Sequence, residues 1–334
     1  MEHLPRIAIT MGDPAGVGPE VIAKAFLEDE WSGVCRAVVI GAAGFMQSVC
    51  RQSAPAVSVR SIASPREARC QPGVIDLIDL DNVSETLDWG RPSARGGQAS
   101  VEYIRAAVNL ALKKEVDALT TAPINKQSIH LAGYPYPGHT EMLAEFTHTS
   151  DVALMLAGRK LRVVLVTTHV PLKGIASRIT ADGVAKTVRL THRWLSRHVC
   201  EHPRIAVTGL NPHCGEGGIF GEEEITAILP ALETVRNEGL HADGPFSADS
   251  LFARNAFDRY DAIVTMYHDQ GMIPVKMESM GAAVNITLGL PIIRTSVDHG
   301  TAYDIAGTGT ASPESLKSAI RAAVSLSKSI FAAP

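Results

Sequence analysis

The sequence predicts an α/β fold with a mostly parallel sheet, and three observations support this prediction. Short β-branched runs alternate with longer segments in which apolar residues recur at three-to-four spacing. Such alternation is typical of strands joined by helices, a connection that makes neighbouring strands parallel. At 334 residues with 46% hydrophobic residues, the chain is too long for one domain of typical size. We therefore expect two domains with large buried cores.

The expected elements follow one another along the whole chain. Strands are predicted at residues 7–10, 37–40, 74–80, 118–120, 163–167, 205–208, 262–266 and 284–287. The clearest helices are predicted at residues 101–113, 181–197, 222–237 and 313–331. Residues 84–98 are rich in Gly, Ser, Arg and Pro, so we expect an exposed loop before the first of these helices.

Composition limits the partners that the chain is expected to bind. A formal net charge of -4 and a sequence pI near 6.3 give no basic excess for nucleic acid or an anionic membrane surface. Apolar runs stay far below the roughly 20 residues that cross a bilayer. The five cysteines are scattered, and the amino terminus has no secretory pattern. These features indicate a cytoplasmic protein with reduced thiols and small-molecule ligands.

A glycine-rich segment, GDPAGVGPE at residues 12–20, directly follows the first expected strand. Gly12, Gly16 and Gly18 permit a tight turn and a close approach of a ligand to the backbone, and the following helix start offers N–H groups to an anion. The spacing matches neither a strict dinucleotide fingerprint nor a Walker A motif. Taken alone, the segment is as well explained by a simple turn.

Three histidines, His169, His213 and His268, each lie in a turn-like segment just after an expected strand. The carboxyl ends of strands meet at the ligand crevice of an open α/β sheet. Three imidazoles there are able to hold one divalent ion and leave positions for substrate. Asp249 and Asp269 are candidates for a supporting carboxylate or a further ligand. The alternative for any one histidine is a surface or hydrogen-bonded core residue.

A second set of side chains indicates an anionic substrate. Lys276, Asn285 and Arg294 interrupt otherwise apolar, strand-like segments, where a charge usually faces a cleft. Arg binds carboxylate or phosphate with two donors, and Lys adds a point charge. His139 and Thr140 open a predicted helix whose N–H groups suit an anion. Structural ion pairs and an ordinary N-cap at Thr140 are the alternatives.

The loop at residues 298–309 combines glycines with polar side chains just before the last expected helix. Such a loop is able to wrap the adenosine end of a nucleotide, although this evidence is weak by itself. Its candidate residues are His299, Gly300, Asp304 and Gly307.

Together these segments resemble the 4-hydroxythreonine-4-phosphate dehydrogenase family of pyridoxal phosphate biosynthesis. The resemblance covers essentially the whole chain. It is carried by the MGDPAGVGPE, GHTE, TH, LNPH, YHDQG and RTSVDHG segments, which begin at residues 11, 138, 168, 210, 267 and 294.

The resemblance implies two α/β/α domains like those of isocitrate and isopropylmalate dehydrogenases, with the active site in the cleft between them. It implies a terminal domain on the cofactor side, residues 1–123 with 275–334, and an inserted domain at 124–274 for the metal and dimerisation. It also implies a homodimer that shares its active sites.

The resemblance further implies a role for each candidate residue. His169, His213 and His268 would hold one divalent metal ion, Zn, Mg, Mn or Co, although the isocitrate-type relatives use aspartates. Substrate would be bound by His139, Thr140, Lys276, Asn285 and Arg294. NAD or NADP would lie against Gly12, Asp13, Gly16, Gly18, His299, Gly300, Asp304 and Gly307.

The implied reaction is oxidation of 4-phosphooxy-L-threonine at C3, followed by decarboxylation to 3-amino-2-oxopropyl phosphate. The general base stays open among Asp249, Asp269, Lys276 and a water relay. A sister enzyme acting on 4-phospho-D-threonate or 4-phospho-D-erythronate is the nearest alternative. A metallohydrolase and a small-molecule binding protein are more remote ones.

Overall fold

The computed structural model describes residues 4–84, 87–253 and 258–331, which form two compact units. Unit 1 comprises Met1–Ser150 and Leu290–Pro334, and unit 2 comprises Asp151–Gly289. Both boundaries fall later in the chain than the expected ones near residues 123 and 275. The reason is packing, because residues 126–146 contact a helix of unit 1 and residues 284–288 pair with a strand of unit 2.

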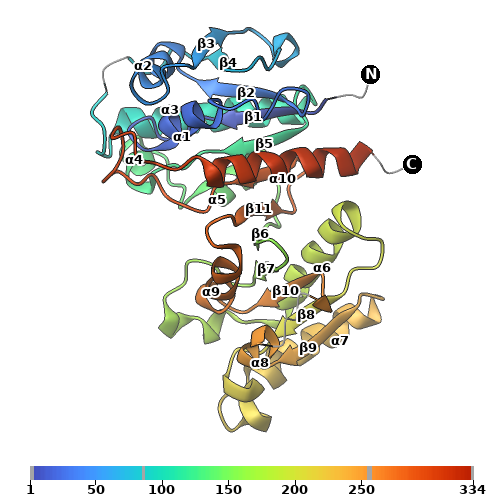
Figure 1. The fold of residues 1–334 in the computed structure, drawn as a ribbon. Coiled ribbons are helices and arrows are strands. Elements are labelled where there is room, and N and C mark those ends of the chain that lie inside the picture. The colour runs from blue at the N-terminus through green and yellow to red at the C-terminus, as the bar shows by residue number, and fades with distance from the viewer. Residues whose placement is uncertain (1–3, 85–86, 254–257, 332–334) are drawn as a thin grey trace. The chain divides into compact units, whose positions relative to one another are not determined.

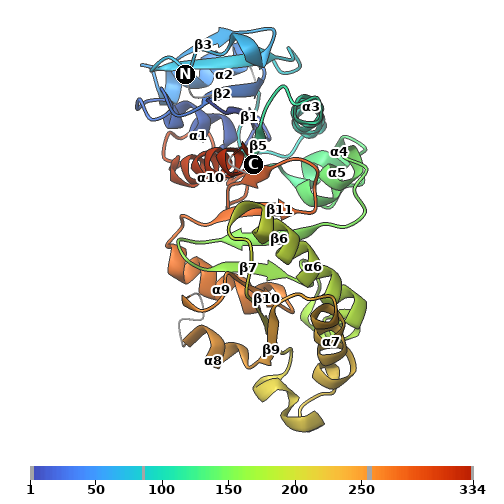
Figure 2. The same ribbon diagram turned by 90° about the vertical axis from the view of Figure 1, so that its right-hand side faces the viewer.

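Unit 1 contains a parallel sheet with the strand order β3-β4-β2-β1-β5-β12. Its strands are β1 (Arg6–Thr10), β2 (Arg36–Gly41), β3 (Ser58–Ser61), β4 (Val74–Asp79), β5 (Ala118–Thr121) and β12 (Arg294–Ser296). Its helices are α1 (Gly18–Ala25), α2 (Ala43–Ser53), the 3-10 turn η1 (Pro65–Glu67), α3 (Ala94–Leu112), α4 (Lys126–Leu131), α5 (His139–Phe146) and α10 (Glu314–Phe331). The α3 helix lies on one face of this sheet, and α1 and α10 lie on the other (Figure 1, Figure 2).

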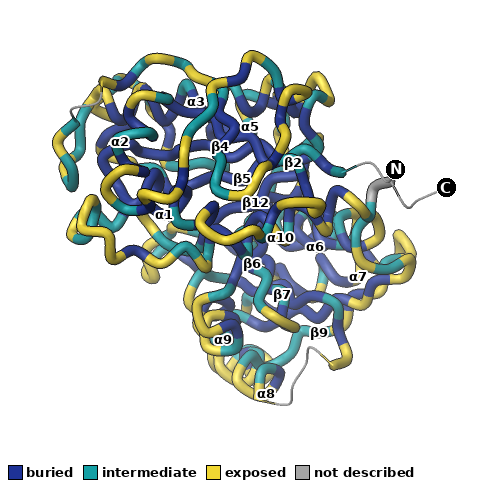
Figure 3. The backbone as a smooth tube through the Cα atoms, turned by 45° about the horizontal axis from the view of Figure 1, so that its top comes forward, coloured by how far each residue is buried: buried dark blue, intermediate teal, exposed yellow. Residues whose placement is uncertain are grey.

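Helices cover both faces of the unit 1 sheet, which explains why the sequences of its central strands are continuously apolar. Residues of β1, β2 and β5 are almost all buried, and the strands at the middle of unit 1 are dark blue in Figure 3. Side chains on both sides of such a parallel sheet must therefore be apolar or small. The expected α/β class with a mostly parallel sheet is confirmed.

The α3 helix begins earlier than the sequence predicted. It starts at Ala94, with the Ser93 hydroxyl accepting a hydrogen bond from Gly96 N, so the last third of the expected loop is helical. Gly97 explains this start, because a Cβ there would lie 1.9 Å from the backbone oxygen of Ser128 in α4. The glycines that suggested a loop instead allow two helices to pack backbone to backbone. Residues 85 and 86 of the expected loop lie outside the described part of the chain.

Unit 2 contains a mixed sheet with the strand order β11-β6-β7-β10-β8-β9. Its strands are β6 (Ala153–Ala157), β7 (Arg162–Leu165), β8 (Ile205–Thr208), β9 (Ala242–Phe246), β10 (Ala262–Thr265) and β11 (Val284–Leu288). The β6 strand is antiparallel to both its neighbours, while β7, β10, β8 and β9 are parallel.

Helices cover both faces of this second sheet. They are α6 (Ala181–His198), α7 (Leu229–Asn237), α8 (Ala248–Ala253) and α9 (His268–Ser279), with η2 (Leu172–Gly174), η3 (Ala176–Arg178), η4 (Pro212–Gly218) and η5 (Glu224–Ile228). The α6 and α7 helices lie on one face and α9 on the other (Figure 2). The core of unit 2 contains side chains of β7 and α9, including Val163, Leu165, Met272 and Val275.

The strand-like interpretation of residues 274–276 was wrong, because they lie inside α9. Gly271 lets this helix approach the sheet, since a Cβ there would lie 2.3 Å from Val163 Cγ1. Pro274 is accommodated within the helix, and Lys276 is exposed in its last turn. A short apolar run does not by itself distinguish a buried helix from a strand.

Within the described ranges, no helix is both long and apolar enough to cross a membrane.

Candidate functional site

The three candidate histidines follow three adjacent parallel strands of unit 2. His169 comes four residues after the end of β7, His213 five residues after β8, and His268 opens α9 directly after β10. In the sheet, β10 lies between β7 and β8. All three imidazoles therefore belong to the same carboxyl-terminal edge, the usual place for ligands in such sheets.

Two of these histidines lie side by side. The ring centroids of His169 and His268 are 6.0 Å apart. His268 Nδ1 lies 2.6 Å from a carboxylate oxygen of Asp269, which leaves Nε2 of His268 to bind a ligand. A carboxylate on the other ring nitrogen is the usual support of a metal-binding histidine. Across the described residues, however, no three His, Cys, Asp or Glu side chains converge into a formed metal site.

His213 stands in an unusual turn whose backbone is left-handed over five consecutive residues. The φ angles of residues 213–217 are 52°, 55°, 75°, 44° and 68°. Non-glycine residues in this region are strained, and such turns persist only where their surroundings hold them. His213 is exposed on this turn.

A buried carboxylate anchors the segment before that turn. Glu224, 2% exposed, accepts hydrogen bonds from the backbone N–H groups of Leu210 and Asn211, both at 2.7 Å, and from the Asn211 amide at 2.9 Å. Burial opposes the charge, but these hydrogen bonds prevail and lower the pKa of Glu224. The sequence offered no signal for Glu224, since it is one of several acidic residues in a helical stretch.

Gln270 joins the ends of two of the three strands. Its side-chain oxygen accepts hydrogen bonds from Thr208 Oγ1 and Met266 N, both at 2.8 Å, and its nitrogen donates to Gly209 O at 2.8 Å. These bonds tie the end of β8 to the end of β10 and to the start of α9. Gln270 therefore fixes the segments that carry His213 and His268.

Asp249 lies in α8 and is a carboxylate at neutral pH. A hydrogen bond from the Ser247 hydroxyl, then one from the Ser250 backbone, lower its pKa, and the charge of His213 adds to this effect. The structure thus places Asp249 within electrostatic range of His213. An ionised, exposed carboxylate has the right protonation state for a general base.

The two remaining candidates of unit 2 come from α9 and β11. Lys276 is exposed on α9, and Asn285 is half-buried in β11, which pairs with β6.

In unit 1, Arg294 forms a buried cationic centre on β12. It is 3% exposed, and its Nη2 and Nε donate to Thr121 Oγ1 at 2.7 and 3.2 Å. Burial lowers the pKa of Arg294 to about 9, so the guanidinium is still protonated at neutral pH. A charged group in such a position favours an anion beside it.

His139 lies within electrostatic range of Arg294, at the first position of α5, and Thr140 follows it. Burial, and then the positive charge of Arg294, lower the pKa of His139 well below its usual value, so this imidazole is neutral. Among the residues that the structure describes, Nε2 of His139 is buried without a hydrogen-bond partner. A neutral imidazole, a guanidinium and the first N–H groups of a helix form a set of donors suited to a phosphate or carboxylate.

The candidate cofactor glycines of residues 12–18 all have packing reasons within unit 1. A Cβ on Gly12 would lie 2.4 Å from Pro123 O, one on Gly16 would lie 2.8 Å from the Thr301 side chain, and one on Gly18 would lie 2.4 Å from Met11 O. The segment therefore packs against residues 122–123 and against the loop at 298–309. The structure brings the two expected cofactor loops together.

Asp13 joins these loops through a buried polar network. Its carboxylate accepts hydrogen bonds from the Tyr303 hydroxyl at 2.7 Å and from Ala15 N at 2.9 Å. Burial raises the pKa of Asp13, although both of those hydrogen bonds act in the opposite direction. Tyr303 also lies 3.0 Å from the Ser128 hydroxyl of α4. Asp13 is thus engaged inside the protein.

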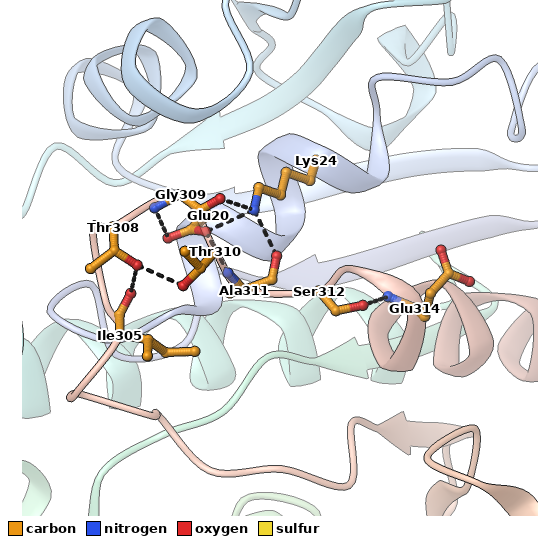
Figure 4. A network of polar contacts seen from close by, with 9 residues as sticks. All are labelled: Glu20, Lys24, Ile305, Thr308, Gly309, Thr310, Ala311, Ser312 and Glu314. Atoms are coloured by element: carbon orange, nitrogen blue, oxygen red, sulfur yellow. Dashed lines mark hydrogen bonds and ion pairs between the residues drawn. The ribbon is translucent and has the colours of Figure 1, made fainter.

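Two side chains of α1 hold the second loop (Figure 4). Glu20 is fully buried and accepts hydrogen bonds from Ala311 N at 2.9 Å and Lys24 Nζ at 2.9 Å. Lys24 also donates to the backbone oxygens of Gly309 and Ala311, both at 2.7 Å. This ion pair fixes the loop's carboxyl-terminal half without any ligand.

The outer part of this loop is less enclosed. Gly300 and Asp304 are exposed, and a Cβ on Gly300 would meet only open space. Gly307, with φ of 75°, packs against the Trp89 ring. Within the described part of the chain, Nε2 of His299 is buried without a hydrogen-bond partner.

The fold and these residues define the chain as an α/β protein with candidate ligand side chains at the carboxyl ends of parallel strands. A β-decarboxylating dehydrogenase from Thermococcus kodakarensis has the same fold at a TM-score of 0.50 and 16% identity, over 96% of this chain and 82% of that one. A family described as pyridoxal phosphate biosynthetic protein PdxA matches residues 33–323, and the chain belongs to this family.

Relatives match over nearly the full length of the chain. The 4-hydroxythreonine-4-phosphate dehydrogenase of Trichlorobacter lovleyi is 49% identical over 96% of this chain and 97% of its own. The D-threonate 4-phosphate dehydrogenase of Cupriavidus necator is 47% identical, over 96% of each. The crystal structure of 4-hydroxythreonine-4-phosphate dehydrogenase from Klebsiella pneumoniae matches at a TM-score of 0.89 and 42% identity, over 97% of this chain and 98% of that one. The predicted family is confirmed, and with it the dehydrogenase class.

Proposed function

We propose that this protein oxidises 4-phosphooxy-L-threonine at C3 with NAD or NADP, and that decarboxylation yields 3-amino-2-oxopropyl phosphate. The observation that carries this proposal is the set of histidines after β7, β10 and β8, in a chain 49% identical to a 4-hydroxythreonine-4-phosphate dehydrogenase. Family membership favours an oxidoreductase over the metallohydrolase and the small-molecule binding protein.

His169, His213 and His268 are the residues that would hold a divalent metal ion. The fit rests on donor chemistry, since imidazole suits Zn and Co, and on the bond between His268 Nδ1 and Asp269, which presents Nε2 of His268 as a ligand. When bound, such an ion supplies Lewis acidity, which lowers the pKa of an attached hydroxyl and polarises a carbonyl.

The other side chains bind the substrate and move its proton. Arg294, neutral His139 and Thr140 at the start of α5 bind one anionic group, and Lys276 with Asn285 binds another. Asp249, whose pKa is lowered by its hydrogen bonds, accepts the proton of the hydroxyl at C3. We assign the loops at residues 12–18 and 299–307 as the segments that would hold the nicotinamide cofactor, which would supply the hydride acceptor.

Exposed apolar side chains beside the histidines support a homodimer. Leu172 is 78% exposed near His169, and Ile219 is 75% exposed near His213. On α9, which His268 opens, Ile273 and Met277 are 57% and 74% exposed. Large apolar side chains that are exposed in several segments of one unit are expected where another chain covers them. We assign this surface to a second copy of the chain, which would cover the histidine edge.

The second candidate is a dehydrogenase for 4-phospho-D-threonate or 4-phospho-D-erythronate. It is favoured by the relative from Cupriavidus necator, a D-threonate 4-phosphate dehydrogenase at 47% identity. Both substrates carry a phosphate and a carboxylate, so the same basic residues would bind them.

Initial rates of NAD and NADP reduction with each of the three phosphorylated acids test the proposal. We expect kcat/KM to be highest for 4-phosphooxy-L-threonine, with about one molecule of carbon dioxide released for each molecule of nicotinamide reduced. A higher value for a D-threonate or D-erythronate substrate would establish the second candidate instead. Absence of reduction with all three would contradict both.

A further inference from the structure

A basic pocket lies at the edge of unit 1, on segments that carry none of the candidate site residues. It has a volume of about 410 Å³ and is formed by the beginning of β2, the end of β3 and the η1 turn. Four arginines line it against one acidic residue: Arg36, Arg60, Arg66 and Arg69, with Glu67. Such a concentration of positive charge is notable in a chain of net charge -4.

A buried carboxylate fixes one side of this pocket. Asp76, 1% exposed, accepts a hydrogen bond from Arg60 Nε at 2.7 Å and others from Arg69 N and Cys70 N at 2.7 and 3.1 Å. Arg36 Nη1 donates to Ala68 O at 2.5 Å. Two guanidinium groups and the backbone that carries a third are thus held in place before any ligand arrives.

The other two arginines are differently engaged. Within the described ranges, the guanidinium groups of Arg66 and Arg69 have no hydrogen bond or ion pair with protein, and both residues are exposed. Asp76 compensates the charge of Arg60, whereas Arg36 bonds only a neutral carbonyl, so the repulsion among Arg36, Arg66 and Arg69 opposes folding. A dianion in the pocket would remove this repulsion and gain charge-assisted hydrogen bonds.

We propose that this pocket binds the phosphate group of a small phosphorylated molecule, with Arg66 and Arg69 as its main ligands. A guanidinium group is able to bind phosphate with two donors, so the exposed groups of Arg66 and Arg69 together suit phosphate better than a single carboxylate. The volume is within the range of pockets for small molecules. The site is separate in sequence from every residue assigned to oxidation of the substrate.

A rival explanation is that the arginines protect an exposed sheet edge. The β3 strand is the first strand of the unit 1 sheet, and charged side chains at such edges prevent pairing with other chains. This explanation requires charge but no bound anion. It predicts aggregation of variants that lack the arginines and no response of the pocket to phosphate.

Hydrogen exchange of the full-length protein, followed by mass spectrometry, distinguishes the two. Inorganic phosphate and glycerol 3-phosphate are each compared with chloride at equal ionic strength. We expect both phosphates to slow exchange within residues 60–70. Stronger protection by glycerol 3-phosphate would identify an organic phosphate as the ligand, and equal protection would identify free phosphate.

The double variant Arg66→Ala, Arg69→Ala should weaken phosphate binding in this segment about tenfold or more. The control Arg193→Ala, Arg197→Ala removes the same charge from exposed positions of α6 and should retain wild-type protection. Protection that is absent from residues 60–70 of the wild type would overturn the proposal, whether or not the variants fold. Protection that persists in the Arg66, Arg69 variant would overturn it equally.

Discussion

At the scale of single residues, Glu224 connects stability to the position of His213. Its carboxylate binds the two N–H groups that precede the left-handed turn and packs against Gly215 within that turn. Buried donors that lose a charged acceptor cost considerable free energy. The turn is strained by its φ angles, so it has little reason to persist without this anchor.

We therefore expect Glu224→Gln to lower the free energy of unfolding by about 3 kcal/mol and to weaken metal binding about tenfold or more. The glutamine keeps one oxygen for the N–H groups of Leu210 and Asn211, but its NH2 group would face the donating Asn211 side-chain amide, and the negative charge that strengthens all three bonds would be lost. Urea unfolding and metal titration measure the two effects. The exposed neighbour Glu222→Gln is the matched control and should change neither. A destabilised Glu224→Gln protein with unaltered metal affinity would contradict the link to His213.

His139 should make stability depend on pH. Burial and the charge of Arg294 lower its folded-state pKa well below 6.5, so below pH 6.5 the unfolded chain binds a proton that the folded chain does not. The stabilising contribution is thus complete above pH 6.5 and is lost as pH falls toward the folded-state pKa. The loss should not exceed about 1.4 kcal/mol per pH unit.

Unfolding free energies of the wild type and of His139→Asn, measured between about pH 8 and pH 5, test this expectation. The wild type should lose stability more steeply below pH 6.5 than the variant. Parallel pH profiles would show that His139 is protonated in the folded protein.

The positions of the three candidate histidines after strands could be predicted from sequence. The side chains that hold the histidine-bearing segments in place could not. His169, His213 and His268 follow β-branched runs, which is a local pattern. Glu224 and Gln270 act on backbone groups brought near by the fold, and Gln270 bonds Thr208 across a separation of 62 residues. Such pairs have no local signature in a single sequence.

At the scale of elements, glycines decide how closely helices approach one another and the sheets. Gly97 and Gly271 both sit in helices, where glycine is normally unfavourable, and each has backbone or side-chain atoms where a Cβ would be. The sequence alone assigned the first to a loop and the second to a turn. Their role depends on α4 and β7, which lie elsewhere in the chain.

The substitution Gly97→Ala should destabilise the protein by about 3 kcal/mol, because the new Cβ would overlap Ser128 O. Replacing glycine by alanine in an unobstructed helix interior would instead stabilise the protein by up to about 1 kcal/mol. The sign of the change in unfolding free energy therefore shows whether the position is obstructed. Gly174→Ala is the control, since its Cβ would have its nearest contact at 3.6 Å. Thermal or urea unfolding of the three proteins gives the answer, and a stabilised Gly97→Ala protein would refute the close packing of α3 on α4.

Element boundaries were predicted least well where packing overrides local pattern. The expected loop contained the first turns of α3, and the expected strand at residues 274–276 was part of α9. The β6 strand was not predicted, because its antiparallel pairing with β11 and β7 departs from the strand-helix alternation. The buried parallel strands were predicted well, since coverage on both faces imposes a continuous apolar run.

For the whole molecule, the α/β class can be predicted from the periodicity of apolar residues along the chain. Assembly depends instead on the side chains that are exposed at the surface. Leu172, Ile219, Ile273 and Met277, which neighbour the three histidines in sequence, are exposed, and the proposed dimer interface includes them. Replacing Ile273 and Met277 by Asp should therefore convert the proposed dimer to a monomer and reduce activity with it.

Sedimentation velocity of this double variant and of a control checks the assembly. Leu131→Asp changes a residue that is 55% exposed in unit 1 and should leave the dimer intact. If the wild-type protein sediments as a monomer at assay concentrations, the proposal that two copies of the chain share an active site is contradicted.

We propose that three histidines at one sheet edge hold a divalent ion that is needed for oxidation of a phosphorylated hydroxy-acid. The most direct test of this claim is the rate of nicotinamide reduction with 4-phosphooxy-L-threonine after a chelator has stripped the protein of metal. We predict that turnover disappears, that Zn, Mg, Mn or Co restores it, and that His213→Ala recovers little under the same conditions. Full turnover by the rigorously metal-free protein would contradict the claim.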